Sequence, residues 1–196
     1  GKATYRNRFI RTRGFEAEQI AGESLWGGLA DPPGVSKRPG FGAHGGLKDT
    51  ASTDVVVHNG KAIATFYQCG EGYVLDPETL ENQGIAPWVP LDGISAHPKV
   101  DEATGELMFF NYSKHPPYMH YGVVDADGKL VTYVPIALPG PRLPHDMCFS
   151  ENWSILNDLP VFWDAELMKH RNLHAVRLHE GVPSRFALIP RHGTAE

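Results

Sequence analysis

The stretch Asp54-Val55-Val56-Val57-His58-Asn59-Gly60-Lys61-Ala62-Ile63-Ala64-Thr65-Phe66-Tyr67 carries the clearest fold signal of this 196-residue chain. Three valines follow one another before Asn59-Gly60, and a second apolar run comes directly after that pair. β-branched residues favour strands, and an Asn-Gly pair tolerates the positive φ angles of a tight hairpin turn. We therefore expect a β-hairpin with strands at Asp54–His58 and Ala62–Tyr67.

Similar strand-like runs recur along the chain, separated by turn signals such as Ala103-Thr104-Gly105 and Asp125-Ala126-Asp127-Gly128. The further strands expected are Tyr5–Arg11, Glu106–Tyr112, Met119–Val124, Leu130–Ile136, Met147–Phe149, Trp153–Leu156 and Phe186–Ile189. Repeated hairpins predict an all-β fold of the sandwich, barrel or propeller type. No internal repeat of about 40 to 50 residues stands out, so the residues alone do not select among these three.

Helical signals are few and short. The best is Asp164–His170, where Asp164 is placed to act as the N-cap. The segment Asp31–Gly46 has no periodicity and contains three prolines and five glycines, which predicts a long loop.

Composition excludes several classes of protein. A net charge of −5 and a pI near 6.1 give no basic footprint for nucleic acid. No apolar run approaches the roughly 20 residues needed to cross a bilayer, and no signal peptide is visible. Cys69 and Cys148 have neither a metal-binding nor a redox spacing, so we expect two reduced thiols in a cytoplasmic protein. Neither end shows a domain-boundary signal, which predicts that residues 1–196 are an internal piece of one larger domain, without a second domain.

Two of the ten histidines have unusual settings. His97 lies in Ala96-His97-Pro98-Lys99-Val100-Asp101, and His145 lies in Pro144-His145-Asp146-Met147. Pro98 biases His97 toward an extended backbone, and a rigid approach suits a metal-bound imidazole. The two lie 48 residues apart, so they could share a metal only if the fold brings distant strands together.

Both settings resemble blocks of the carotenoid oxygenase family. Further agreement lies in Tyr5-Arg6-Asn7-Arg8-Phe9, Thr104-Gly105-Glu106, Leu75-Asp76-Pro77-Glu78-Thr79-Leu80-Glu81, Glu151-Asn152, Asp158-Leu159-Pro160, Pro183-Ser184-Arg185-Phe186 and Ile189-Pro190-Arg191. The similarity covers nearly the whole chain, and members of the family are more than twice as long. It implies a seven-bladed β-propeller, of which this chain would supply roughly three blades with few short helices.

The resemblance also implies a metal centre. Family members hold Fe(2+) on the propeller axis with four histidines from different blades, and use O2 to cleave a C=C bond into two carbonyl products. By that match His97 and His145 are the first two iron ligands, and the other two lie beyond Glu196. The implied cofactor is Fe(2+), and the implied enzyme is a carotenoid cleavage dioxygenase whose fragment 1–196 would be inactive by itself.

The chain departs from the family pattern near the expected substrate site. Many members have a glutamate that orients a ligand histidine where Gln68 stands here, in the Phe66-Tyr67-Gln68 strand. Stilbene-cleaving relatives bind the substrate phenol with a lysine and a tyrosine, and Tyr67 and Leu29 take those places here. Phe66, Tyr67 and Leu29 are therefore expected to line a site for an apolar polyene, a carotenoid or apocarotenoid.

Two other functions stay open at this point. One is a stilbene-cleaving dioxygenase of the same family, and the other is a non-catalytic propeller that binds a polyene or a protein. Two further histidines beyond Glu196 would favour an enzyme over a binding module. The double bond that is cleaved, the oligomeric state and peripheral contact with a membrane are also left open by the sequence.

Overall fold

A computed structural model describes residues 1–41, 46–172 and 175–193. Its helical elements are α1 (Arg13–Ala21), the short 3-10 helix η1 (Pro33–Val35) and α2 (Ala165–Arg171). Its strands are β1 (Asp54–His58), β2 (Lys61–Thr65), β3 (Tyr73–Leu75), β4 (Asn82–Ile85), β5 (Lys99–Val100), β6 (Leu107–Tyr112), β7 (Tyr118–Val124), β8 (Leu130–Ala137), β9 (Met147–Phe149), β10 (Trp153–Asp158), β11 (Val161–Trp163), β12 (Val176–Leu178) and β13 (Arg185–Pro190).

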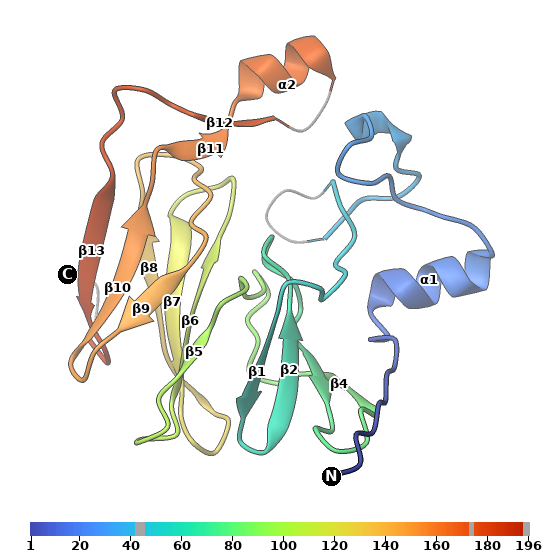
Figure 1. Ribbon diagram of the computed structural model, residues 1–196. Coiled ribbons are helices and arrows are strands. Elements are labelled where there is room, and N and C mark those ends of the chain that lie inside the picture. Colours follow the sequence, from blue (N-terminus) through green and yellow to red (C-terminus); the bar gives the residue numbers. More distant parts are fainter. Residues whose placement is uncertain (42–45, 173–174, 194–196) are drawn as a thin grey trace.

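The strands form three sheets that lie side by side, with a small hairpin above the third (Figure 1). The first two are four-stranded antiparallel meanders, in the orders β1-β2-β3-β4 and β5-β6-β7-β8. The third has the order β13-β10-β9, and the β11–α2–β12 excursion separates β10 from β13 along the chain. Successive four-stranded meanders packed next to one another are the blades of a propeller.

The first strands of the three sheets define a common edge. β5 contacts both β1 and β9, so the starting strand of each sheet lies beside the starting strand of the next. These strands begin 45 and 48 residues apart, at Asp54, Lys99 and Met147. The backbone therefore repeats from sheet to sheet. The repeat is not visible in the sequence because equivalent positions carry different side chains.

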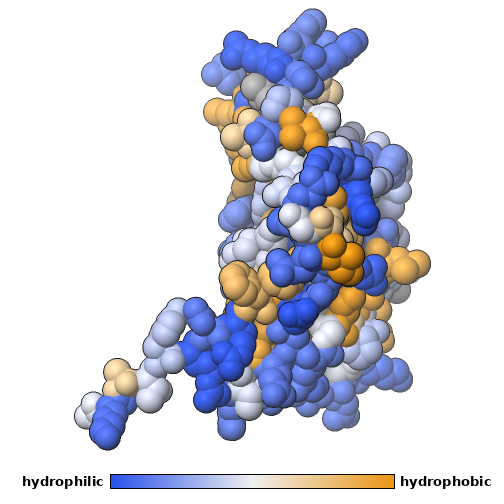
Figure 2. All heavy atoms as spheres, turned by 90° about the vertical axis from the view of Figure 1, so that its right-hand side faces the viewer, coloured by the Kyte–Doolittle hydropathy of each residue, from blue (hydrophilic) through white to orange (hydrophobic). Residues whose placement is uncertain are grey.

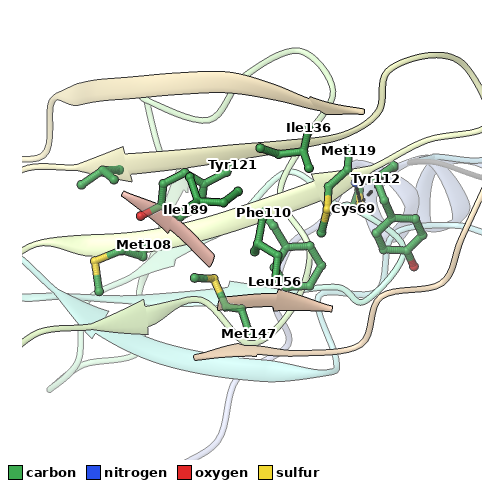
Figure 3. Close-up of a cluster of buried hydrophobic side chains, with 11 residues drawn as sticks. Cys69, Met108, Phe110, Tyr112, Met119, Tyr121, Ile136, Met147, Leu156 and Ile189 are labelled. Carbon is green, nitrogen blue, oxygen red and sulfur yellow. Dashed lines mark hydrogen bonds between the residues drawn. The ribbon is translucent and has the colours of Figure 1, made fainter. Parts of the chain in front are cut away.

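The core lies between neighbouring sheets. β6 is buried along its whole length, and its two faces serve different clusters. Leu107 and Phe109 pack toward the first sheet, where Ile63 and Val74 belong to the same cluster. Phe110 lies on the opposite face, against Leu156 of the third sheet, with Met147 beside it (Figure 3). Burying both faces of one strand ties three sheets into a continuous core.

Most of the expected strands are confirmed to within two residues at each end, including Asp54–His58 and Met147–Phe149. The expected strand at Tyr5–Arg11 is wrong. Residues 1–9 are exposed and without regular structure, and the beginning of the chain projects away from the body (Figure 2). The segment is held at single points instead, as where the Arg6 guanidinium donates to the Glu78 carbonyl at 2.8 Å. Its alternating pattern therefore finds no neighbouring strand among the described residues.

The two α-helices differ in how well the sequence foretold them. α2 confirms the expected helix, and the Asp164 carboxylate accepts from the Leu167 backbone N–H as an N-cap. α1 was missed, although Thr12 caps it in the same way by accepting from the Phe15 N–H at 3.0 Å. Only Gly14 of α1 is buried, so the helix lacks the apolar stripe by which a helix is normally recognised. In the loop Asp31–Gly46 the described residues contain only η1, and residues 42–45 lie outside the described part.

Candidate metal centre

His97 and His145 lie together at the common edge of the sheets. Each is placed two residues before a starting strand, since β5 begins at Lys99 and β9 at Met147. Their ring centroids are 5.1 Å apart, with an angle of 50° between the ring planes. The two residues that the sequence singled out, 48 positions apart, are therefore neighbours in space.

The backbone of His97 differs from the expectation. Its φ angle is +62°, in the left-handed region, so the prediction that Pro98 holds it extended is wrong. A non-glycine residue reaches this region only when its surroundings over-determine the conformation. Here Ile94, Ser95 and Ala96 are almost fully buried before it, and Pro98 is buried after it, so the chain turns sharply at His97 and directs the ring to the edge.

Charged groups flank the two rings. Asp54, the first residue of β1, places its carboxylate Oδ2 3.4 Å from Nδ1 of His97. Asp146 forms an ion pair with Lys99, in which the Lys99 Nζ donates to Oδ1 at 2.7 Å. Burial raises the pKa of Asp146, but the bonds from Lys99 and from the Met147 N–H outweigh it, so the net pKa is lowered. Among the described residues, Asp146 forms an ion pair with a lysine and Asp54 does not.

Gln68 lies in the turn that follows β2, so the prediction that Phe66-Tyr67-Gln68 continues the strand is wrong. Its side chain is fully buried, and its amide donates to the Tyr67 hydroxyl at 2.7 Å. Its amide oxygen Oε1 has no hydrogen-bond partner among the described residues. A buried polar atom without a partner is costly, and such atoms cluster at functional sites. No hydrogen bond joins the Gln68 side chain to His97 or His145 in the described part, so its expected role toward a ligand histidine stays a prediction.

The residues expected to line a substrate site are brought together only in part. Phe66 and Tyr67 are in edge-on contact, with ring centroids 5.0 Å apart, and Phe66 is buried. Leu29 is 56% exposed and lies in the loop region after α1. No contact between Leu29 and the other two is recorded for the described residues, so the three-residue site also stays a prediction.

The donors present suit a metal such as Fe(II), but they do not complete a site. Imidazole nitrogen is a good ligand for iron, and with metal–nitrogen bonds of about 2.1 Å two imidazoles on one ion have centroids on the order of 5 Å apart. The observed 5.1 Å between His97 and His145 fits that arrangement. Among the described residues no group of three or more His, Cys, Asp or Glu side chains could hold a metal ion. The assignment of His97 and His145 as two metal ligands therefore stays a prediction.

Asp54 is the residue at this site that sequence reasoning missed. In the sequence it reads only as the first residue of a strand, and nothing in its surroundings resembles a metal motif. The available signal was positional, because the starts of the first strands of neighbouring blades meet at the axis. That signal becomes usable only once the 45- and 48-residue spacing of the sheets is known.

Comparison with known proteins decides the family. The model of the family described as "Retinal pigment epithelial membrane protein" matches residues 1–196, the whole chain. The chain belongs to the carotenoid oxygenase family. Its solved relatives are β-propellers, so the propeller prediction is confirmed for this member of the family.

The relatives of this chain carry several different names. A carotenoid 9,10(9',10')-cleavage dioxygenase 1 of Phaseolus vulgaris is 31% identical over 220 residues, covering all of this chain and 39% of that protein. An isoeugenol monooxygenase of Pseudomonas nitroreducens is 32% identical, with 98% and 40% covered. A resveratrol cleavage oxygenase 1 of Aspergillus fumigatus is 30% identical, with 98% and 38% covered. The chain therefore spans about two fifths of the length of these relatives.

Two solved structures give the same picture. The lignostilbene dioxygenase of Pseudomonas brassicacearum superposes with a TM-score of 0.78 at 29% identity, over 96% of this chain and 39% of that one. A cobalt-substituted Synechocystis apocarotenoid oxygenase superposes with a TM-score of 0.71 at 23% identity, over 95% and 42%. Both agree with three neighbouring sheets as part of a larger propeller.

Proposed function

We propose that the full-length protein is a non-haem Fe(II) dioxygenase that uses O2 to cleave a C=C bond into two carbonyl products. The observation that carries this proposal is the meeting of His97 and His145 at the common edge of the sheets, with ring centroids 5.1 Å apart. Membership of the carotenoid oxygenase family supports it. The remaining ligands would come from the part of the propeller that lies outside this chain.

Each residue of the site has a definite task in this proposal. His97 and His145 would hold the iron through one ring nitrogen each, and the sharp turn at His97 fixes the direction of its ring. When bound, the iron supplies the site at which O2 and the alkene react. In this chain His145 is exposed and His97 is partly covered, so the apolar surroundings that exclude water would have to be completed by the rest of the propeller. Positioning the chosen double bond in such surroundings is the main contribution of the protein.

We propose an apolar polyene, a carotenoid or apocarotenoid, as the substrate. Leu29 and Tyr67 stand where stilbene-cleaving relatives are expected to have a phenol-binding tyrosine and lysine, and neither carries a positive charge. Tyr67 is also engaged by the Gln68 amide, which leaves its hydroxyl less free for a substrate. The sequence identities do not separate the candidates, since they are 31% to the Phaseolus vulgaris enzyme and 32% to the isoeugenol monooxygenase.

A stilbene or phenylpropenoid substrate is the second candidate. It is favoured by the superposition on the lignostilbene dioxygenase, with a TM-score of 0.78. The two candidates differ in length and in the phenol, so a substrate panel separates them. A non-catalytic propeller is the third reading, and it predicts turnover of none of these compounds.

The test is aerobic incubation of the full-length, iron-loaded protein with carotenoids, apocarotenals, stilbenes and isoeugenol, followed by product analysis under ¹⁸O2. We expect label in both carbonyl products of a polyene. His97→Ala and His145→Ala should each abolish cleavage and lower the bound iron, because a lost ligand removes both affinity and geometry. Normal iron content and turnover in either variant would refute the assignment of the ligands.

The cellular setting is also a proposal. We place the protein in the cytoplasm, with peripheral contact to a membrane as the route by which an apolar polyene reaches it. In the part of the chain that the structure describes, no helix is long and apolar enough to span a bilayer. Flotation of the full-length protein with phospholipid vesicles tests the peripheral contact.

A further inference from the structure

The carboxylate of Asp54 is the strongest feature of the site that the proposed function does not use. It lies on β1, in the blade before the one that contributes His97, and its Oδ2 is 3.4 Å from the His97 Nδ1. The side chains of both residues are largely covered, with 29% and 25% of their surface exposed. Two facing groups with this much burial interact more strongly than an exposed pair does.

Hydrogen bonds hold both the side-chain carboxylate and the backbone carbonyl of Asp54. Its Oδ1 accepts from the Val55 backbone N–H at 2.8 Å, and its carbonyl accepts from the Thr65 hydroxyl at 3.3 Å. Asp54 is paired with Thr65 in the β1–β2 hairpin, three residues before Gln68. The strand pairing fixes the backbone of Asp54, and the bond to the Val55 N–H restricts rotation of its carboxylate. Together they keep Oδ2 facing the imidazole of His97.

The second carboxylate near His97 is already committed. Asp146 accepts from Lys99 and from its neighbour's N–H, both at 2.7 Å. Asp54 has no lysine or arginine within ion-pair distance among the described residues, and the His97 ring is the partner that it faces. A carboxylate without a cation partner is a good acceptor for the ring N–H of a histidine that binds a metal.

We propose that Asp54 is a positioning residue for the metal centre, which accepts a hydrogen bond from the Nδ1–H of His97 and so presents Nε2 to the metal. The inference rests on the proposed function, because it takes His97 as an iron ligand. The hydrogen on Nδ1 fixes the tautomer, and the carboxylate increases the basicity of Nε2. The separation of 3.4 Å shortens to a hydrogen bond once the metal holds the other nitrogen.

The position of this carboxylate also explains the glutamine at position 68. Gln68 brings no negative charge where many members of the family are expected to have a glutamate. Asp54 supplies a carboxylate from the neighbouring strand and aims it at His97. The chain thus keeps a negative charge beside its iron ligands, delivered from a different strand and to a different histidine.

The test is metal binding by the full-length protein, measured anaerobically by competition with a chelator for Fe(II) and for Co(II). We expect Asp54→Asn to weaken both metals about 10- to 100-fold, because loss of a partner that orients a ligand typically has this effect. The visible spectrum of the Co(II) protein should keep its shape, since the number of ligands is unchanged. The unfolding temperature of the metal-free protein should also be unchanged, because Asn keeps the bond to the Val55 N–H.

Two comparisons make the result decisive. Asp127→Asn makes the same chemical change in an exposed turn and should leave metal affinity as it is. His97→Ala should lose affinity and change the Co(II) spectrum; if it does neither, the iron site itself is wrong. If His97→Ala behaves as expected, any one of three results for Asp54→Asn would overturn the inference about Asp54 while leaving the iron site intact. These are unaltered affinity, a spectrum changed as in His97→Ala, or a matching loss of metal-free stability.

Discussion

Gln68 is one of three described residues that have a buried side-chain polar atom without a hydrogen-bond partner. Its Oε1 has no partner among the described residues, while its amide nitrogen donates to the Tyr67 hydroxyl. We expect Gln68→Glu in the full-length protein to preserve the fold, because the Tyr67 hydroxyl can donate to the new carboxylate. The added negative charge should strengthen retention of Fe(II) by about 10-fold or more. Chelator competition measures this, with turnover of the best substrate as a second reading.

Gln68→Met is the matched control for that change. It has a similar length and no polar group, so it removes the unpartnered oxygen without adding charge. It should not strengthen iron retention, and it should weaken it if that oxygen accepts from a ligand histidine. If Gln68→Glu moves neither affinity nor rate beyond error, Gln68 is not near the iron ligands and its expected role is wrong.

Gly70 is a position where the backbone approaches a side chain too closely for any other residue. A Cβ atom built on Gly70 would lie 2.3 Å from Oδ2 of Asp49, which is almost fully buried and accepts from the Glu71 and Ala51 N–H groups. Gly70→Ala must push this carboxylate away from its donors. We expect it to lower the free energy of unfolding by about 2–3 kcal/mol.

Gly34→Ala provides the comparison, since nothing lies within 4 Å of its added Cβ. Its effect on stability should stay within about 0.5 kcal/mol. Urea unfolding of both full-length variants measures the difference, and equal stabilities would show that the loop around Asp49 yields at little cost.

At the scale of elements, Arg191 ties the third sheet to the second. It directly follows β13, is 3% exposed, and its Nη2 reaches Asp101 at 2.6 Å and Glu106 at 2.8 Å. We expect Arg191→Leu to lower the free energy of unfolding by about 2–4 kcal/mol, because Asp101 loses its ion-pair partner and Glu106 keeps only His192. This loss of stability is somewhat smaller than the roughly 3–5 kcal/mol for breaking a fully buried ion pair, because the side chains of Asp101 and Glu106 are each 17% exposed.

The control is Lys37→Leu, which breaks an exposed pair with Glu23 and should cost at most about 1 kcal/mol. The effect of Arg191→Leu should also depend on pH. The hydrogen bond from Arg191 lowers the pKa of Asp101, so its contribution is present above the ordinary value of about 3.9 and disappears as the pH falls through the folded value. A cost that stays constant into strong acid would contradict this account.

Elements could be foreseen from the sequence where local chemistry is strong. The Asn59-Gly60 turn and the Asp164 cap each determine their own element, and both are confirmed. Short strands such as β5 and β11, of two and three residues, carry too little pattern and exist because neighbouring strands pair with them. Tyr5–Arg11 is the opposite case, in which a strand-like pattern meets no partner among the described residues. The pairing of strands that are far apart in the chain cannot be read from local sequence patterns.

At the scale of the molecule, the same limit applies to the metal centre. The settings of His97 and His145 pointed to a shared site, and the fold brings their rings together as that expectation requires. Asp54 was out of reach, because its role depends on which strand lies beside β5. The turn at His97 was also missed. A residue before proline normally has an extended backbone, but the buried neighbours of His97 hold it in the left-handed region.

The outer faces of the first and third sheets carry apolar side chains that the chain itself does not cover. Val55 and Val57 on β1 are each 58% exposed, and Phe186 and Leu188 on β13 are 64% and 61% exposed. In a propeller such faces pack against the next blade. We therefore predict that residues 1–196 expressed by themselves are inactive and poorly soluble. They should also bind metal weakly, because they would supply two of the four expected histidine ligands.

Size-exclusion chromatography with iron analysis tests this prediction, and a surface variant gives it a mechanism. Phe186→Thr and Leu188→Thr together should increase the soluble fraction, because they remove exposed apolar area and introduce β-branched threonines, which suit a strand. Val131→Thr changes one exposed residue of β8, 47% exposed, and should help less. A monodisperse, cooperatively melting monomer with stoichiometric iron would show instead that these sheets need no further blades. In that case the apolar faces on β1 and β13 would be ordinary exposed surface, and the ligands would have to be sought within the chain.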